Sequence, residues 1–394
     1  MNELSKLLSL PESEKISRGL THTPGEIAQQ PETWVSTFQL FRSRREEVVQ
    51  FLSAAGVSGA ADCNVTVFLV GAGTSDYIGH SLTHLLRKLW QCEVIAVPST
   101  DLLTHMDELL IPGRKYLWIS FSRSGDSSEG VAVLDRAYNH RPDIHHFVVS
   151  CNESGRMVVE NAHKPQFLTV CLSDAANDRG LAMTSAFSNM VIFGHCLAHQ
   201  GAPDRYEPIL LKLVAAAKNF LPRAADCTAG LAKEEYRKAC FIASGPLRAA
   251  ARESALKLLE LTAGKTLTMS ESALGLRHGP MAALDHDTLL VSFLSGSKPV
   301  QAYERDLLRE VGSKRLVGSR IVVAGGEQGR DSYAEHCLAL AELGTVGDEY
   351  RIPVDVIFGQ LLGLFSSIQW GITPDCPSPS GAISRVVENI NIHS

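Results

Sequence analysis

The chain has 394 residues, of which 45% are hydrophobic and 20% charged, and its formal net charge is −6. This length suits two ordinary domains, and the composition is typical of a globular protein with a sizeable core. Because the acidic balance excludes a global basic field, we expect neither nucleic acid nor a membrane as a partner, and any anionic ligand needs a local binding device.

Residues 1–15 form only a brief apolar stretch broken by serine and proline, which indicates neither a signal peptide nor a membrane span. The chain also has nine cysteines and no CxxC motif. This pattern favours free thiols in a reducing compartment over a zinc site. We therefore expect a cytoplasmic protein.

The predicted elements alternate between helices and short apolar strands. Pro31 opens a helix expected over 31–53, and we assign residues 1–50 to an N-terminal helical extension. Further on, helical patterns at 81–89 and 130–138 fall between strands that are apolar throughout, which indicates a parallel sheet covered on both faces. The expected strands are Val65–Val70, Val94–Val97, Tyr116–Ser120, His146–Ser150 and Phe167–Leu172.

The second half of the chain repeats this layout. Strands expected at 239–244, 289–294 and 320–325 follow their counterparts by 173 or 174 residues, and the sequence VIFG at 191–194 recurs at 356–359. We therefore predict two copies of one α/β domain, over 51–205 and 206–394. The connection lies near 199–204, with a linking helix over 208–220.

Two loops of the first copy follow strands of the expected sheet, where parallel sheets bind ligands. In the first loop, Gly71 and Gly73 let backbone N–H groups approach a ligand, and Thr74 and Ser75 stand where a helix would begin. A dinucleotide fingerprint would need a third glycine where this chain has Asp76. A Rossmann cofactor site is therefore disfavoured.

The second loop, residues 120–129, reads SFSRSGDSSE. Its Ser122, Ser124 and Ser127 can each donate a hydroxyl to a phosphate monoester without a lysine cage. The alternative is a helix N-cap at Ser127 or Ser128, which explains one hydroxyl and not three. The equivalent loops of the second copy, at 243–247 and 292–297, have a proline and fewer hydroxyls. We therefore expect the first copy to bind the phosphate.

Candidate groups for proton transfer lie in the second copy. On a helix, Lys257 and Glu260 are i, i+3 neighbours within the largely apolar run at 254–262, so Glu260 could be a general base. An ordinary surface salt bridge is the alternative. His278 precedes Gly279 and Pro280, and its spacing alone also fits a structural histidine in a turn.

Taken together, these motifs resemble the sugar isomerase (SIS) superfamily, whose members bind phosphosugars on duplicated flavodoxin-like domains. The resemblance covers the chain from about residue 50 to its end. This part is similar to the isomerase half of glucosamine-6-phosphate synthase. It implies an α/β fold with two tandem SIS domains, each a parallel sheet with helices on both faces. The motifs are GAGTS at 71–75, SRSGDS at 122–127, ALKLLE at 255–260 and HGP at 278–280.

The resemblance also implies roles for these residues. Ser75, Ser122, Ser124 and Ser127 would hold the phosphate, Glu260 would move a proton between C1 and C2, and Lys257 would support the enolate. His278 would open the sugar ring, reaching the site from a neighbouring subunit, so a homodimer or larger homo-oligomer is expected. Gly73, Thr74 and Arg123 belong to the same binding loops, and Ala182 to a segment near the sugar hydroxyls in which Met183 replaces a serine. Arg123 points either at the phosphate or into water.

The C-terminal segment is similar to a narrower branch of the superfamily. Arg385 falls at or next to the lysine with which the synthase forms an imine. A guanidinium stays protonated and forms no imine, but it can clamp an oxygen. The run at 374–387 resembles galactosamine-6-phosphate deaminase/isomerases, also called tagatose-6-phosphate ketose/aldose isomerases.

This branch implies an isomerising deaminase that acts on galactosamine 6-phosphate and needs no metal or organic cofactor. One alternative is a ketose/aldose isomerase without deamination. Another is a phosphosugar-sensing regulator without chemistry, but such relatives usually have a DNA-binding domain, and this acidic chain has no basic N-terminal module. The residues Lys257, Glu260 and His278 favour an enzyme.

Overall fold

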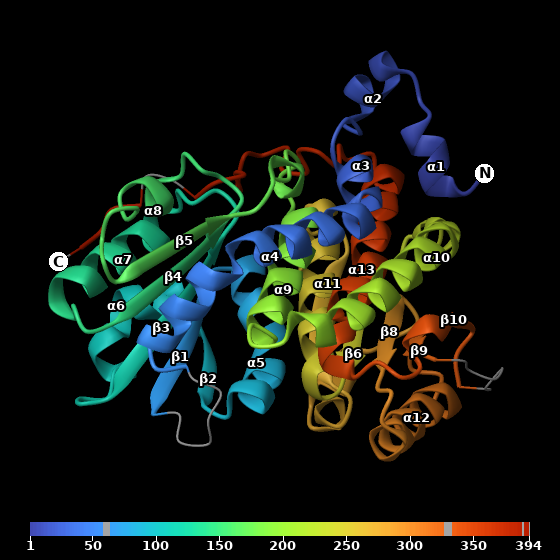
Figure 1. Ribbon diagram of the computed structural model, residues 1–394. Helices are drawn as coiled ribbons and strands as arrows, with labels where there is room; N and C mark the ends of the chain where they lie inside the picture. Colours follow the sequence, from blue (N-terminus) through green and yellow to red (C-terminus); the bar gives the residue numbers. More distant parts are fainter. Residues whose placement is uncertain (58–63, 327–332, 388–389, 394) are drawn as a thin grey trace. The chain divides into compact units, whose positions relative to one another are not determined.

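The structure is a computed structural model that describes residues 1–57, 64–326, 333–387 and 390–393 (Figure 1). The chain divides into two compact units, each built around one parallel five-stranded sheet. The β1–β5 unit comprises Glu32–Asp178, Ser185–Pro208 and Ile383–Ser394, and the β6–β10 unit comprises Met1–Pro31, Arg179–Thr184 and Ile209–Ala382. The predicted α/β class with two parallel sheets is confirmed.

The sheet of the β1–β5 unit has the strand order β2-β1-β3-β4-β5, the flavodoxin-like order. All seven residues of β1 are buried, as expected for a central strand covered on both faces. The strands are β1 (Val65–Gly71), β2 (Glu93–Pro98), β3 (Lys115–Ser122), β4 (His145–Ser150) and β5 (Phe167–Cys171). The helices are α4 (Gln30–Ala54), α5 (Thr74–Trp90), α6 (Ser99–Leu109), α7 (Ser128–His140), α8 (Arg156–Val159) and α9 (Ser185–Ala198).

Alternate strand residues of this unit pack on opposite faces of the sheet. Phe68 and Trp118 belong to the cluster that includes side chains of α6 and α7. On the other face, Phe147 contacts Phe193 of α9 edge to face, and α5 packs against both α9 and β1. Helices therefore cover both faces of the sheet, as predicted.

The sheet of the β6–β10 unit has the order β10-β9-β8-β6-β7, which repeats the first topology strand for strand. The strands are β6 (Lys238–Ala243), β7 (Leu267–Ser272), β8 (Thr288–Leu294), β9 (Ser319–Gly325) and β10 (His336–Leu340). The helices are α1 (Glu3–Leu8), α2 (Glu12–Arg18), α3 (Thr23–Ala28), α10 (Glu207–Ala232), α11 (Arg248–Leu261), α12 (Lys298–Ser313) and α13 (Asp348–Gln369).

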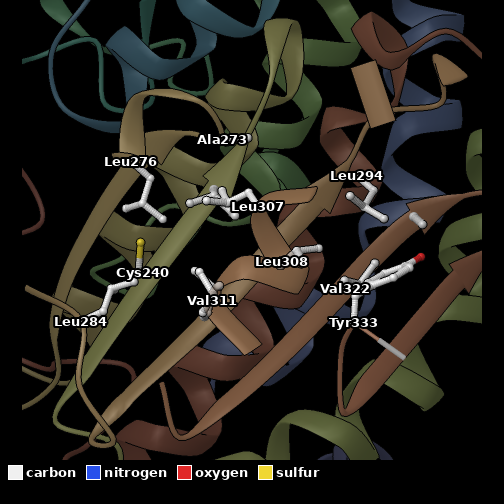
Figure 2. Close-up of a cluster of buried hydrophobic side chains, with 13 residues drawn as sticks. Cys240, Ala273, Leu276, Leu284, Leu294, Leu307, Leu308, Val311, Val322 and Tyr333 are labelled. Atoms are coloured by element: carbon white, nitrogen blue, oxygen red, sulfur yellow. The ribbon is translucent and has the colours of Figure 1, made fainter. Parts of the chain in front are cut away.

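The core of this second sheet lies on both of its faces. Figure 2 shows one side, where Leu307, Leu308 and Val311 of α12 pack among strand residues such as Cys240 and Val322. On the other side, α11 and α13 pack against each other and against strands of the sheet. One helix of the described residues, α13, is long and apolar enough to cross a membrane, but 89% of its apolar window is buried inside the structure. It is therefore the core helix of its unit.

The repeated VIFG sequence has the same packing role in both units. A Cβ on Gly194 of α9 would lie 2.2 Å from Cδ1 of Leu82 in α5. A Cβ on Gly359 of α13 would lie 2.3 Å from Cβ of Ser254 in α11. In each unit a glycine therefore lets two helices approach closely, which explains why this short sequence recurs with the fold.

The sequence reading missed two strands and several helix bounds. The missed strands, β7 and β10, are the edges of the second sheet and are only partly buried. The sequence of β7, LTMSES, has no continuous apolar run, and that of β10, HCLAL, has none of the β-branched or aromatic residues that favour strands. α1, α2 and α3 were included only in a general helical extension, and the linking helix α10 continues past the predicted end at 220 to Ala232. The domain limits 51–205 and 206–394 remain our prediction.

Candidate active site

The glycine loop of the β1–β5 unit joins β1 to α5 by a turn that only glycine accommodates. Gly73 has φ +57° and precedes the first residue of α5, Thr74. A Cβ on Gly71 would lie 2.3 Å from the backbone carbon of Ser75. As predicted, Thr74 and Ser75 begin a helix, and both are buried in its positively polarised first turn.

The serine loop, residues 122–127, connects β3 to α7 and directs its hydroxyls by backbone contacts. The N–H of Gly125 donates to Oγ of Ser122 at 3.0 Å, and the N–H of Asp126 donates to Oγ of Ser124 at 3.2 Å. A hydroxyl that accepts such a bond keeps its own hydrogen for a ligand. Both serines are therefore arranged as donors.

Ser127 stands at the N-cap position of α7, as the alternative interpretation proposed. Within the described chain, however, its side chain makes no capping hydrogen bond. Helix capping therefore does not account for this hydroxyl. The position lies at the positive end of a thirteen-residue helix, which favours an anion there.

The loop after β4 packs against the serine loop and donates hydrogen bonds to it. Gly125 has φ +66°, and a Cβ on it would lie 3.1 Å from both Cα of Gly155 and Oγ of Ser150. Asn152 donates from Nδ2 to the carbonyl of Ser124 at 2.8 Å, and the N–H of Met157 donates to the carbonyl of Gly125 at 2.8 Å. These contacts hold the loop in one conformation.

Arg123 lies within the serine loop, but its side chain is 5% exposed and so does not point into water. Nη2 of Arg123 donates to the backbone carbonyl of Arg385 in the C-terminal segment at 2.5 Å. The N–H of Ser128 donates to the carbonyl of Val387 at 3.2 Å. The serine loop and the C-terminal segment are thus hydrogen-bonded neighbours.

The guanidinium of Arg385 binds the segment that precedes α9. It donates to the carbonyl of Asp178 from Nε at 2.9 Å and from Nη2 at 2.6 Å, and to Oδ1 of Asn177 at 2.7 Å. The carboxylate of Asp178 accepts from the N–H groups of Ser185 and Ala186, the first residues of α9, at 3.0 and 2.8 Å. Arg385 is therefore held to a rigid helix terminus.

In the β6–β10 unit, the segment predicted to approach the sugar hydroxyls is itself tightly held. Ala182 is 2% exposed. The N–H of Leu181 donates to the carbonyl of Asp375 at 3.0 Å, and the N–H of Gly180 donates to the carboxylate of Glu26 at 3.2 Å. The segment is therefore positioned by its backbone.

The predicted pair of Lys257 and Glu260 lies on α11 and forms an ion pair. Nζ of Lys257 lies 2.7 Å from Oε2 of Glu260 and 3.4 Å from Oε1 of Glu253. The side chains of Lys257 and Glu253 are 1% and 0% exposed, whereas that of Glu260 is 24% exposed. The pair is therefore no ordinary surface salt bridge, and Glu260 is the member that a substrate could reach.

Glu253 is a further candidate site residue, which the sequence analysis did not name. It lies four residues before Lys257 on the same face of α11, so the i, i+4 spacing was the available signal. Two carboxylates beside one buried ammonium offset part of the cost of burying its charge.

The close packing of α11 on α13 positions the three charged residues Glu253, Lys257 and Glu260. A Cβ on Gly363 would lie 3.0 Å from the carbonyl of Lys257, and the matching contact of Gly359 is with Ser254. Thr268 of β7 also donates to the carbonyl of Ala255 at 2.9 Å. The helix is thus fixed on two sides.

His278 lies in an exposed turn of the same unit, between two short 3₁₀ helices (Gly275–Arg277 and Pro280–Ala283). The next residue, Gly279, has φ +125°, a conformation that favours glycine. Among the described residues, no hydrogen bond or ion pair joins the imidazole to Lys257 or Glu260.

In the second copy, the loop at 292–297 corresponds to the serine loop, and a carboxylate of the protein itself accepts the hydrogen bonds that this loop can donate. The carboxylate of Asp348, at the start of α13, accepts from Oγ of Ser295 and, at 2.8 Å, from the N–H of Gly296. The N–H of Ser295 donates to the buried Glu304 at 2.9 Å, and Arg351 donates to Asp348 at 3.2 Å. Burial raises the pKa of Glu304 to about 7. This loop carries internal negative charge, which disfavours a phosphate.

Comparison with known proteins identifies close relatives of this chain. No protein-family model matched it. A relative from Streptomyces coelicolor is 36% identical over 375 residues, covering 95% of both chains. The D-galactosamine-6-phosphate deaminase AgaS of Escherichia coli is 32% identical over 95% of this chain and 96% of its own.

Solved structures agree with these relatives. The tagatose-6-phosphate ketose/aldose isomerase of Escherichia coli has a TM-score of 0.83 and 28% identity, covering 94% of this chain and 96% of its own. The C-terminal domain of glucosamine-fructose-6-phosphate aminotransferase from Francisella tularensis has a TM-score of 0.72 and 18% identity, covering 90% of this chain and 97% of its own. This second likeness shows the fold alone.

Proposed function

This chain belongs to the AgaS family of D-galactosamine-6-phosphate deaminases, and on that basis we propose that it converts galactosamine 6-phosphate and water into tagatose 6-phosphate and ammonia. The observation that carries the proposal is the charged group on α11 formed by Glu253, Lys257 and Glu260. The buried ammonium of Lys257 binds the carboxylate of Glu260, which is still partly exposed to solvent. A positioned carboxylate beside a fixed positive charge suits proton transfer at a carbon next to a carbonyl.

The β1–β5 unit would hold the phosphate. Ser122, Ser124 and Ser127 would donate their hydroxyls, and Ser75 would add a donor at the first turn of α5, where Gly73 and Thr74 shape the loop. Hydroxyls held by backbone contacts lose little entropy on binding, and two helix N-termini favour a dianion. Neutral donors can therefore replace the lysine cage that this loop lacks.

The reaction would begin with opening of the sugar ring, which frees the C1 aldehyde. Glu260 would then remove the proton from C2, and Lys257 would stabilise the negative charge that develops on the oxygen at C1. The proton then returns to C1, the oxygen at C1 takes up a proton and the amino nitrogen loses one, which leaves a C1 hydroxyl and a C2 imine. Water adds to this imine, and ammonia leaves to give the ketone.

The remaining site residues would complete this chemistry. His278 would open the ring, and because it lies in an exposed turn, we propose that it acts in the site of a second subunit. This makes a homodimer or larger homo-oligomer the working state, which we place in the cytoplasm. Arg385 would clamp a sugar oxygen, since a guanidinium can donate but forms no imine. The backbone near Ala182 would line the sugar.

The test is a Glu260→Gln variant of the full chain, incubated with galactosamine 6-phosphate. We expect turnover to fall by about 100-fold or more because the amide accepts no proton, while phosphosugar affinity stays within about threefold. Ammonia and tagatose 6-phosphate are measured together, and Glu234→Gln, an exposed residue of the same unit, is the control. Retention of most activity by Glu260→Gln would show that another group is the base.

The same assay decides between deamination and isomerisation. Ammonia and ketose formed in equal amounts support the deaminase. Interconversion of tagatose 6-phosphate with its aldose, with no ammonia from the amino sugar, would establish the plain isomerase instead. Binding of the phosphosugar without any product would indicate a regulator. Galactosamine and glucosamine 6-phosphates, compared side by side, identify the preferred epimer.

A further inference from the structure

Arg123 belongs to the serine loop, which would hold the phosphate, but it donates a hydrogen bond to a residue outside this loop. Its buried guanidinium donates to the carbonyl of Arg385. We propose that Arg123 is a positioning residue, which holds the C-terminal segment that carries Arg385 rather than binding the phosphate itself. This inference rests on the proposed roles of the serine loop and of Arg385.

A second hydrogen bond joins the same two parts of the chain. The carbonyls of Arg385 and Val387, two residues apart, accept hydrogen bonds from the side chain of Arg123 and from the N–H of Ser128. The chain bends at Arg385 and Val386, so these two bonds hold a bent segment and not a strand. The bond from Arg123 is the one made to Arg385 itself, and it therefore fixes the backbone from which that side chain extends.

Individual contacts hold the segment, because over residues 371–387, all of which are described, the chain forms no helix or strand. Asp375 is held by the N–H of Leu181 and by Thr23. At Arg385, the guanidinium is anchored at Asn177 and Asp178, and the backbone carbonyl is bound by Arg123. A hydrogen bond from a charged donor is stronger than one between neutral groups, so its loss should loosen the segment at Arg385.

Arg123 is buried, so solvent does little to satisfy its guanidinium. A buried guanidinium needs acceptors, and the carbonyl of Arg385 comes from a residue 262 positions away in the chain. The loop carbonyl of Arg123 itself accepts from the N–H of Cys151 at 3.2 Å, which fixes the backbone from which the side chain extends. A lysine has no planar fork and would reach the carbonyl with a rotatable ammonium on a flexible stem.

The first test uses Arg123→Met, which keeps the apolar volume and removes the donors. We expect trypsin to cleave after Arg385 at least tenfold faster than in the parent, kcat to fall about tenfold or more, and the affinity for inorganic phosphate to change less than threefold. The matched control is Arg136→Met, because Nη1 of Arg136 also donates to a backbone carbonyl of this unit, that of Leu103, at 3.1 Å. This control should leave all three measurements unchanged.

The second test combines Arg123→Met with Arg385→Gln in the full chain. If Arg123 acts by placing Arg385, the kcat of the double variant should be about equal to that of the less active single variant. If the two losses of kcat multiply, or if Arg123→Met lowers phosphate affinity more than tenfold, the positioning role is wrong. Unchanged cleavage after Arg385 would also overturn it.

The trypsin measurement needs no turnover, so it separates this inference from the proposed function. A chain that released no ammonia from any amino-hexose phosphate would refute the deaminase, while faster cleavage in Arg123→Met would still support the placement of the segment. Arg123→Lys should fall between the parent and Arg123→Met in both cleavage and kcat.

Discussion

Glu304 offers a test of how the second copy differs from the first. Its side chain is completely buried on α12 and accepts the N–H of Ser295 at 2.9 Å, in the loop that corresponds to the serine loop. Burial raises its pKa from 4.5 to about 7, and Asp348 adds to the effect while Arg351 opposes it. We expect Glu304→Gln to make the folded protein less sensitive to pH, since the amide can still accept the bond from Ser295.

The direction and size follow from proton binding. Between pH 4.5 and about 7 the folded chain binds more protons at Glu304 than the unfolded chain, so the free energy of unfolding falls as the pH rises through this window. At 1.36 kcal/mol per pH unit the whole loss is about 3 kcal/mol, of which about 2.5 kcal/mol falls between pH 5 and pH 8. The contribution is fully present below pH 4.5 and is lost above about pH 7.

Urea denaturation at pH 5 and pH 8, followed by circular dichroism, measures this difference. The parent should lose about 2.5 kcal/mol more stability than Glu304→Gln between the two pH values. Burial also raises the pKa of Asp355, to about 6, but this group is common to both proteins and cancels in the comparison. Equal pH dependence of the two proteins would refute the reasoning, and Glu46→Gln, an exposed residue, is the control.

Two further predictions concern the positioning of α11 and the phosphate loop. Gly359→Ala should destabilise the protein by about 1–3 kcal/mol and lower kcat, because its Cβ would lie 2.3 Å from Ser254 on the helix that carries Lys257 and Glu260. Gly230→Ala, with nothing within 4 Å of its Cβ, should be neutral or stabilising in the same thermal denaturation. Ser127→Ala should weaken the affinity for phosphosugar about 10- to 100-fold, the loss of one hydrogen bond to a charged group, with the exposed Ser154→Ala as control. An unchanged affinity in Ser127→Ala would remove this hydroxyl from the phosphate site.

The sequence by itself determined the fold class and most of the sheet. Central strands such as β1 and β3 are continuous apolar runs because both of their faces are buried, and this signal is local. The internal offset of 173 or 174 residues then identified the duplication. The edge strands β7 and β10 escaped detection because β7 is largely polar and β10 has no β-branched or aromatic residue.

The sequence also indicated candidate site residues where their spacing is short. The serine loop is a cluster within six residues, and Lys257 and Glu260 share a helix face because they are three residues apart. Glu253 obeys the same helical spacing, but nothing in the local pattern distinguished its buried carboxylate from an exposed one.

Only the tertiary structure decided which distant groups meet. The carboxylate of Asp348 reaches a loop 52 residues away, and Arg123 reaches a carbonyl 262 residues away. Such pairings depend on how helices and segments pack after the elements have formed, and neither periodicity nor composition records them. From the sequence, Arg123 could point either at the phosphate or into water. The structure shows that it donates to the carbonyl of Arg385, a partner that no local pattern could indicate.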